Sequence, residues 1–317
     1  DAQESRGLGD VYKRQIVWFV FEDQSPEFFP QYGKTPMKLP AIESLAEDGV
    51  VFKNMHSPSA VCAPSRSAII TGMYPTTLGT HNMRTYNAYK SEAGIPNEPS
   101  LGIPSYSPEF PEYIRPFTEY LRKAGYYCTN NSKEDYNFKI SDEAWDESSN
   151  EAHWLNNNGN QPFFSVFNIM TSHQSRTMVW PYSVFKKHVQ SKLSASEIHD
   201  PKNAPVPEYY PDTPLIRKNI ARYYDCVTAM DKRVGEIMSQ LKEDGLVNDT
   251  IVFFFSDHGS GMPRHKRLLH DTGMKVAMLV HIPEKWKNLS PFHIGTKTSA
   301  FVDFLDLVPT VLSLAGI

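Results

Sequence analysis

Short apolar runs alternate along the chain with segments in which apolar residues recur every three or four positions. The runs predict strands buried on both faces of a sheet, at residues 16–21, 50–52, 162–169 and 251–255. The periodic segments predict helices, at residues 40–49, 117–124 and 216–241. Strands that alternate with helices predict an α/β fold with a mainly parallel, doubly wound sheet flanked by helices.

Two other stretches contain many proline, serine and tyrosine residues and show no period. They cover residues 87–111 and 181–214, and we expect both to be irregular surface segments. The second would lie over the sheet, where it would shape a substrate cleft. Residues 1–15 are polar and resemble a translated sequencing-adapter sequence, so we set them aside as a non-native leader.

The composition limits the class of protein. Of the 317 residues, 40% are hydrophobic and 21% are charged, which excludes a disordered or collagen-like chain. The 32 Lys and Arg residues against 36 Asp and Glu give a net charge of −4, which argues against wrapping nucleic acid. The sequence has no apolar run of the ~18 residues that a membrane span needs. We therefore expect a globular protein with no nucleic-acid partner and no membrane span.

Polar side chains come directly after three of the predicted strands. Glu22 and Asp23 follow the first strand, and His173 comes shortly after the third. Asp257 and His258 follow the fourth. The carboxyl ends of parallel strands meet at one edge of a sheet, where ligands bind. Any one of these acids would equally well cap a helix or face solvent, but several together favour a hard divalent cation. Calcium or magnesium fits better than zinc, because the sequence has no His-x-x-x-His pair.

The most specific pattern is Cys-Ala-Pro-Ser-Arg at residues 62–66, followed by Thr-Gly at residues 71–72. Four fixed positions of this kind arise by chance in about one in 500 chains of this length. The pattern resembles the signature of the type I sulfatases, which belong to the alkaline-phosphatase superfamily. A small buried hydrophobe is the usual fate of a free cysteine, but the Pro-Ser-Arg context favours a functional one.

The resemblance implies a modified nucleophile at Cys62. In that family a formylglycine-generating maturation enzyme oxidises the cysteine to formylglycine (3-oxoalanine), whose hydrated aldehyde attacks sulfur. A plain thiol would form an adduct with no easy exit, whereas the second hydroxyl of the hydrate can expel sulfate and restore the aldehyde. Arg66, one helical turn further on, would hold the hydrated nucleophile and offset negative charge.

The resemblance also assigns the polar strand ends to a metal site. Glu22, Asp23, Asp257 and His258 stand where the family has its calcium ligands, which act together with residue 62. Magnesium is the alternative. Glu22 departs from the family pattern, which usually has aspartate at that position.

Three further residues match sulfate-binding or proton-transfer positions of the family. Lys133 resembles the lysine of a Gly-Lys-x-His segment, although Asp135 stands here at the histidine position. His173 matches the histidine that protonates the leaving group, and Lys266 matches the last sulfate-binding cation. For each alone, a solvated side chain is the alternative.

Other polar residues are candidates for binding the rest of the substrate. We assign this role to His81 and Arg84, which closely follow the signature, and to Asp135. Further histidine candidates, for which a surface or core position is the default, are His56, His265 and His270.

The motifs occur in the family's order along residues 16–317, which we interpret as a sulfatase catalytic domain truncated at its carboxyl end, without the family's smaller second subdomain. The predicted function is hydrolysis of sulfate esters or N-sulfate in a sulfated carbohydrate, with some likeness to the heparan N-sulfatase branch. A phosphonate monoester or phosphodiester hydrolase and an inactive sulfated-glycan-binding relative are the alternatives. By family analogy the compartment would be periplasmic, secreted or lysosomal.

Overall fold

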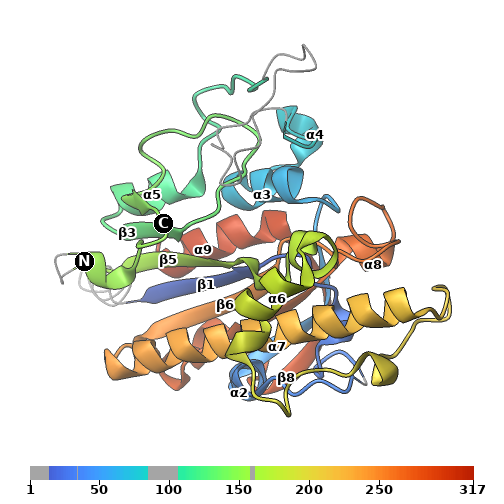
Figure 1. Ribbon diagram of the computed structural model, residues 1–317. Helices are drawn as coiled ribbons and strands as arrows, with labels where there is room; N and C mark the ends of the chain where they lie inside the picture. Colours follow the sequence, from blue (N-terminus) through green and yellow to red (C-terminus); the bar gives the residue numbers. More distant parts are fainter. Residues whose placement is uncertain (1–13, 34, 85–105, 158–160) are drawn as a thin grey trace, which may run out of the picture.

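The computed structural model describes residues 14–33, 35–84, 106–157 and 161–317. Its strands form one sheet in the order β4-β3-β5-β1-β6-β7-β2-β8 (Figure 1). Along the chain they are β1 Gln15–Phe21, β2 Gly49–His56, β3 Tyr127–Asn131, β4 Glu147–Ser148, β5 Phe163–Ile169, β6 Thr250–Ser256, β7 Lys275–His281 and β8 Thr296–Asp303. The α-helices are α2 Pro40–Glu47, α3 Cys62–Thr71, α4 Pro75–Leu78, α5 Phe117–Lys123, α6 Tyr182–His188, α7 Pro214–Glu243, α8 Asp271–Met274 and α9 Leu307–Ala315.

The centre of the sheet is parallel. β1 lies between β5 and β6, so that Ile16 pairs with both Phe164 and Ile251. Within the described residues, β7 is the strand that runs against its neighbours, β6 and β2. The predicted α/β class with a mainly parallel, doubly wound sheet is therefore confirmed.

Helices cover both faces of this sheet (Figure 1). α2 and α7 pack on one face, where Val17 and Phe19 of β1 join their core, and α3, α5 and α9 pack on the other, where Trp18 lies. Apolar side chains on both sides of β1 explain why its sequence reads as an unbroken apolar run. A buried carboxylate ties two helices together, because Asp231 of α7 accepts a hydrogen bond of 2.9 Å from the Ile42 amide near the start of α2.

The predicted strands and helices are present with small shifts at their ends, and β2 runs on to His56. Two regions differ. Segment 181–214 contains α6, because Phe185 and Val189 bury their side chains against Cys226 of α7. Residues 275–317, for which no element was predicted, form β7, β8 and α9.

Part of the sequence interpretation lies outside the described residues. This holds for 1–13 of the expected leader 1–15 and for most of the expected surface segment 87–111. Among the described helices, we find none with both the length and the apolar character of a membrane span.

Candidate active site

Turns that follow four adjacent parallel strands meet at the carboxyl edge of the sheet. β1 leads into Glu22 and Asp23, β6 into Asp257 and His258, β5 through a short turn into His173, and β3 into the loop that carries Lys133. α3 begins at the same edge with Cys62 as its first residue. Residues from five separate parts of the sequence thus surround one point, as the strand-end argument anticipated.

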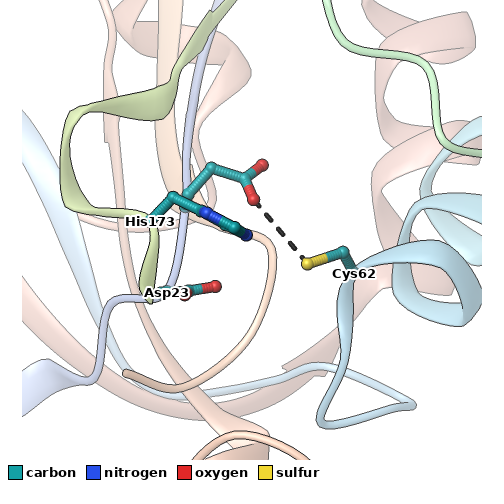
Figure 2. Close-up of side chains that lie close together, drawn as sticks. Asp23, Cys62 and His173 are labelled. Atoms are coloured by element: carbon teal, nitrogen blue, oxygen red, sulfur yellow. Dashed lines mark hydrogen bonds between the residues drawn. The ribbon is translucent and has the colours of Figure 1, made fainter. Parts of the chain in front are cut away.

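Cys62 is fully buried at this point. Its Sγ lies 3.2 Å from His258 Nε2, 3.3 Å from Lys266 Nζ and 3.7 Å from Glu22 Oε2. Figure 2 shows the side chains of Asp23 and His173 on the other side of the gap that the Cys62 thiol faces. Burial alone would raise the pKa of the thiol, but the charges of Lys133 and His258 hold it well below its ordinary value.

Two buried lysines each neutralise one of the strand-end acids. Lys133 Nζ lies 2.7 Å from Glu22 Oε2, and Lys266 Nζ lies 2.8 Å from Asp23 Oδ1. Burial would lower the pKa of both ammonium groups, but the negative charges of Cys62 and of these carboxylates raise both pKa values above the ordinary range. Both lysines therefore stay protonated and present fixed positive charge beside Cys62.

Arg66 lies beneath Cys62 on α3 and is itself buried. It forms an ion pair with Glu22, donates a hydrogen bond of 2.6 Å to Asn168 Oδ1, and places its Nε 3.3 Å from Asp257 Oδ2. Burial would raise the pKa of Glu22, but Arg66 and Lys133 hold it well below its ordinary value. The arginine thus joins the turns after β1, β5 and β6.

Asn168 was missed by the sequence analysis. It lies on β5, where it accepts the bond from Arg66 and donates one of 2.8 Å to Asn130 Oδ1 on β3. The available signal was a polar residue within an otherwise apolar run, which marks a strand position facing a polar site.

The donor set after β1 and β6 fits a hard divalent cation. His258 Nδ1 hydrogen-bonds the Gly259 carbonyl at 2.8 Å, which leaves Nε2 facing Asp23 Oδ1 at 3.2 Å and Asp257 Oδ1 at 3.6 Å. Asp257 Oδ2 is buried and accepts no hydrogen bond from the described residues. Burial and the Glu22 charge raise the pKa of Asp257 to about 7. These acidic groups, together with Glu22, are hard oxygen donors of the kind that calcium and magnesium prefer.

The turn after β6 has no room for a side chain at Gly259. A Cβ atom there would lie 2.0 Å from the Thr272 carbonyl oxygen, closer than any real contact. Glycine therefore lets the segment before β7 pack directly on the turn that carries Asp257 and His258.

Lys266 is held in place by a separate cluster. The Nδ1 of His265 lies 2.7 Å from Ser260 Oγ and 3.1 Å from Ser25 Oγ, and its Nε2 lies 3.1 Å from the Tyr209 hydroxyl. Burial lowers the pKa of His265 to about 4, so the ring is neutral and holds the loop by hydrogen bonds. From the sequence His265 was only a candidate, and Tyr209 could not be found, because nothing local links segment 181–214 to this loop.

The predicted substrate-binding residues lie nearer the surface. Asp135 is buried and accepts a hydrogen bond of 3.2 Å from Arg84 Nη2, whose side chain is 41% exposed. Asp135 Oδ2 also lies 3.6 Å from Lys133 Nζ. His81 is exposed on the segment just before Arg84. The carboxylate at position 135 thus links the buried lysine to an accessible arginine.

His173 faces the centre of the site, whereas two other histidine candidates do not. A contact of 2.8 Å between its Nδ1 and Ser175 Oγ orients the ring. One of its nitrogens lies within 4.8 Å of ligand atoms of Glu22, Asp23 and Cys62. His56 instead stacks on Phe301 at the end of β2, and His270 is exposed.

Comparison with known proteins agrees with this geometry. The family model described as Sulfatase matches residues 14–317. The chain belongs to the sulfatase family. An ulvan-active sulfatase of Formosa agariphila is 37% identical to it over 325 residues, which cover 95% of this chain and 52% of that protein. N-sulphoglucosamine sulphohydrolase of Homo sapiens is 25% identical over 302 residues, covering 89% of this chain and 57% of the human protein. This sulfatase chain thus spans about half the length of these curated relatives.

Solved structures share the fold at lower sequence identity. A 2-O GAG sulfatase superposes with a TM-score of 0.64 at 16% identity, covering 96% of this chain and 71% of that one. Phosphonate monoester hydrolase from Silicibacter pomeroyi gives a TM-score of 0.64 at 16% identity, covering 96% and 73%. The same sheet and helices therefore occur in hydrolases named for two different reactions.

Proposed function

We propose that this chain carries the catalytic part of a sulfatase that removes sulfate from a sulfated carbohydrate. The observation that carries the proposal is the position of Cys62, the first residue of the signature, which lies buried between His258, Lys266 and Glu22. The printed names of the relatives, an ulvan-active sulfatase and N-sulphoglucosamine sulphohydrolase, support a sulfated glycan as the substrate. The proposal covers both O-sulfate and N-sulfate.

The nucleophile of the proposal is formylglycine, made from Cys62 by a maturation enzyme. Its hydrate supplies one hydroxyl to attack sulfur and a second whose deprotonation later expels sulfate. The site supports such a group, because Lys133, Lys266 and the Arg66 guanidinium surround residue 62 with fixed positive charge.

The metal of the proposal is calcium, with magnesium as the alternative. Glu22, Asp23, Asp257 and His258 would hold it, in keeping with Asp257 Oδ2, which accepts no hydrogen bond from the described residues, and with the orientation of His258 Nε2. A bound cation supplies further positive charge beside the sulfate oxygens and residue 62.

Other side chains of this protein carry out the remaining steps of the proposed reaction. Lys133 pairs with Glu22 and Lys266 pairs with Asp23, both beside residue 62. The two ammonium groups bind the sulfate oxygens and stabilise the negative charge that develops as the S–O bond to the carbohydrate breaks. The electron pair of that bond goes to the leaving oxygen, which takes a proton from His173. The contact between His173 and Ser175 sets the direction of this transfer.

The test is mass spectrometry of the peptide containing residue 62 after co-expression with a formylglycine-generating enzyme, followed by sulfate release from ulvan oligosaccharides and N-sulfoglucosamine. We expect conversion at Cys62 and sulfate release, both absent in Cys62→Ala, whose folding is checked by circular dichroism. Conversion without turnover of any sulfate would contradict the enzyme and favour a glycan-binding relative.

The structural likeness to a phosphonate monoester hydrolase supports a second candidate function. Phenyl sulfate and phenyl phenylphosphonate, assayed on the same sample, separate the two. Faster turnover of the phosphonate would replace the sulfatase assignment.

A further inference from the structure

A hollow of about 730 Å³ lies beside the outer strand β8, on the face of the sheet that α2 and α7 partly cover. One wall is the loop after β1, which contributes Pro26, Pro30 and Tyr32. The other walls are β2, β8 and the segment that enters β7. The hollow is thus formed by parts of the chain that are far apart in sequence and that the proposed reaction does not use.

Three lysines from three neighbouring strands line this hollow: Lys53 of β2, Lys275 of β7 and Lys297 of β8. The register explains why they share a face. Lys297 pairs with Val51, which belongs to the core under α2, and Lys53 follows Val51 by two residues. Lys275 stands two residues before Ala277 of the same core. Beyond the part of the sheet that α2 covers, this face therefore carries lysines instead of apolar side chains.

The three ammonium groups have no acidic partner among the described residues. Lys275 Nζ donates to Asn54 Oδ1 at 3.2 Å, and Lys297 Nζ donates to the Gln31 carbonyl. Elsewhere on the surface Lys232 and Lys285 pair with Glu197 and Asp249. An unpaired cluster on a chain with a net charge of −4 is a local attractor for anions.

Two acids also line the hollow, Glu27 and Asp271. Glu27 is exposed, and its carboxylate lies on the side of the hollow that faces His265. The three lysines therefore outnumber the two acids in the lining.

Side-chain contacts connect the lining of the hollow to the segment that carries Lys266. Ser25 Oγ donates to the Thr272 carbonyl at 2.8 Å, and Glu27 Oε1 lies 3.6 Å from His265 Nδ1. His265 precedes Lys266, which contacts Cys62. A short series of contacts thus runs from the lining of the hollow to Lys266.

We propose that this hollow is a second binding site for a sulfated oligosaccharide, in which Lys53, Lys275 and Lys297 hold sulfate groups that are not being hydrolysed. The identity of the ligand rests on the proposed function, because a polymeric sulfatase substrate carries sulfate on sugars other than the reacting one. The prolines and Tyr32 supply apolar surface for a sugar ring between the charges.

The test compares a triple variant, Lys53→Gln, Lys275→Gln and Lys297→Gln, with a matched control, Lys123→Gln, Lys187→Gln and Lys242→Gln, which removes three exposed lysines elsewhere. Binding of a sulfated ulvan octasaccharide is measured by calorimetry on chains that also carry Cys62→Ala, so no turnover interferes. Turnover of 4-nitrophenyl sulfate is measured on the same lysine variants with residue 62 converted.

We expect the hollow variant to bind the octasaccharide about tenfold more weakly, since three partly exposed charge pairs each contribute a fraction of a kcal/mol. Its affinity should also depend less on salt, and its turnover of the aryl sulfate should equal that of the parent. The control should keep both properties. Unchanged affinity, an equal loss in the control, or a parallel loss of aryl-sulfate turnover would each overturn the proposal.

The two proposals fail in distinguishable ways. If no sulfate ester is turned over but octasaccharide binding still depends on the three lysines, the second site stands and the sulfatase reaction does not. If aryl sulfate is turned over and the triple lysine variant binds the octasaccharide as the parent does, the sulfatase reaction stands and the second site does not.

Discussion

Lys133 and Lys266 bring the same charge close to Cys62 by different structural means. Lys133 follows β3 by two residues and ends on Glu22, the residue after β1. Lys266 lies in the long segment between β6 and α8 and ends on Asp23. The position of the first lysine follows from a strand end, whereas the second depends on a folded loop.

The supports of the two lysines differ accordingly. Asp135, two residues from Lys133, lies 3.6 Å from its ammonium group, and Arg84 pairs with Asp135. The loop of Lys266 is held by Ser25 and Tyr209, which contact His265, and by the Tyr210 hydroxyl, which donates to the Pro263 carbonyl. The lysine that follows a strand end thus has few supporting contacts, while the loop of the other lysine is held by contacts from distant parts of the chain.

The largest effect that tests this comparison comes from removing the charges themselves. Lys133→Met and Lys266→Met should each lower kcat/KM for a sulfate ester by ~10²–10³-fold, because each removes a buried cation beside the reacting group. Steady-state kinetics on converted protein measure this, with Lys123→Met as a surface control. A loss of kcat/KM in only one of the two variants would show that only one of the lysines contributes to turnover.

A smaller effect is expected from the support of Lys266. Tyr209→Phe removes one hydroxyl from His265, and His265→Ala removes the contacts with Ser25, Ser260 and Tyr209, so kcat/KM should fall by about tenfold in the second and less in the first. The loss should appear in kcat, while the melting temperature changes little in Tyr209→Phe. If the parent chain, Tyr209→Phe and His265→Ala had equal kcat/KM values, the loop would hold Lys266 without the contacts of His265.

The exposed support of Lys133 should matter less. Arg84→Met breaks a pair in which the arginine is 41% exposed, so KM should rise by about fivefold or less with kcat retained. Raising the salt concentration should reduce the difference between Arg84→Met and the parent chain. A fall in kcat as large as that of Lys133→Met would place Arg84 at the reacting atoms.

The smallest effect is a shift in the pKa of the unmodified thiol. Lys133 is the main charge that lowers the pKa of Cys62, so Lys133→Met should raise this pKa, by more than Lys266→Met does. The measurement is the rate of iodoacetamide labelling against pH in calcium-free buffer, whose midpoint should move to higher pH. Burial raises the pKa of the Cys128 and Cys226 thiols, so these two cysteines are not labelled in the same pH range. A larger shift in Lys266→Met would reverse the ranking.

Much of the fold was readable because its signals are local. The runs that became β1, β5 and β6 are apolar on both faces, and α7 shows an unbroken helical period. β8 escaped notice because its side chains alternate between exposed and half-buried at the edge of the sheet. α6 escaped notice because its burial depends on Cys226 and Ala229 of a helix far along the chain.

The sequence by itself determined the fold class, the signature at Cys62 and the residue types that follow each strand, since all of these are properties of neighbouring residues. Only the tertiary structure decided that Lys133 pairs with Glu22 and Lys266 with Asp23, and that Asn168 and Tyr209 support the site. The physical reason is that Coulomb energies, desolvation and hydrogen bonds depend on distances in space. Those distances arise only when turns from separate strands meet at one edge of the sheet.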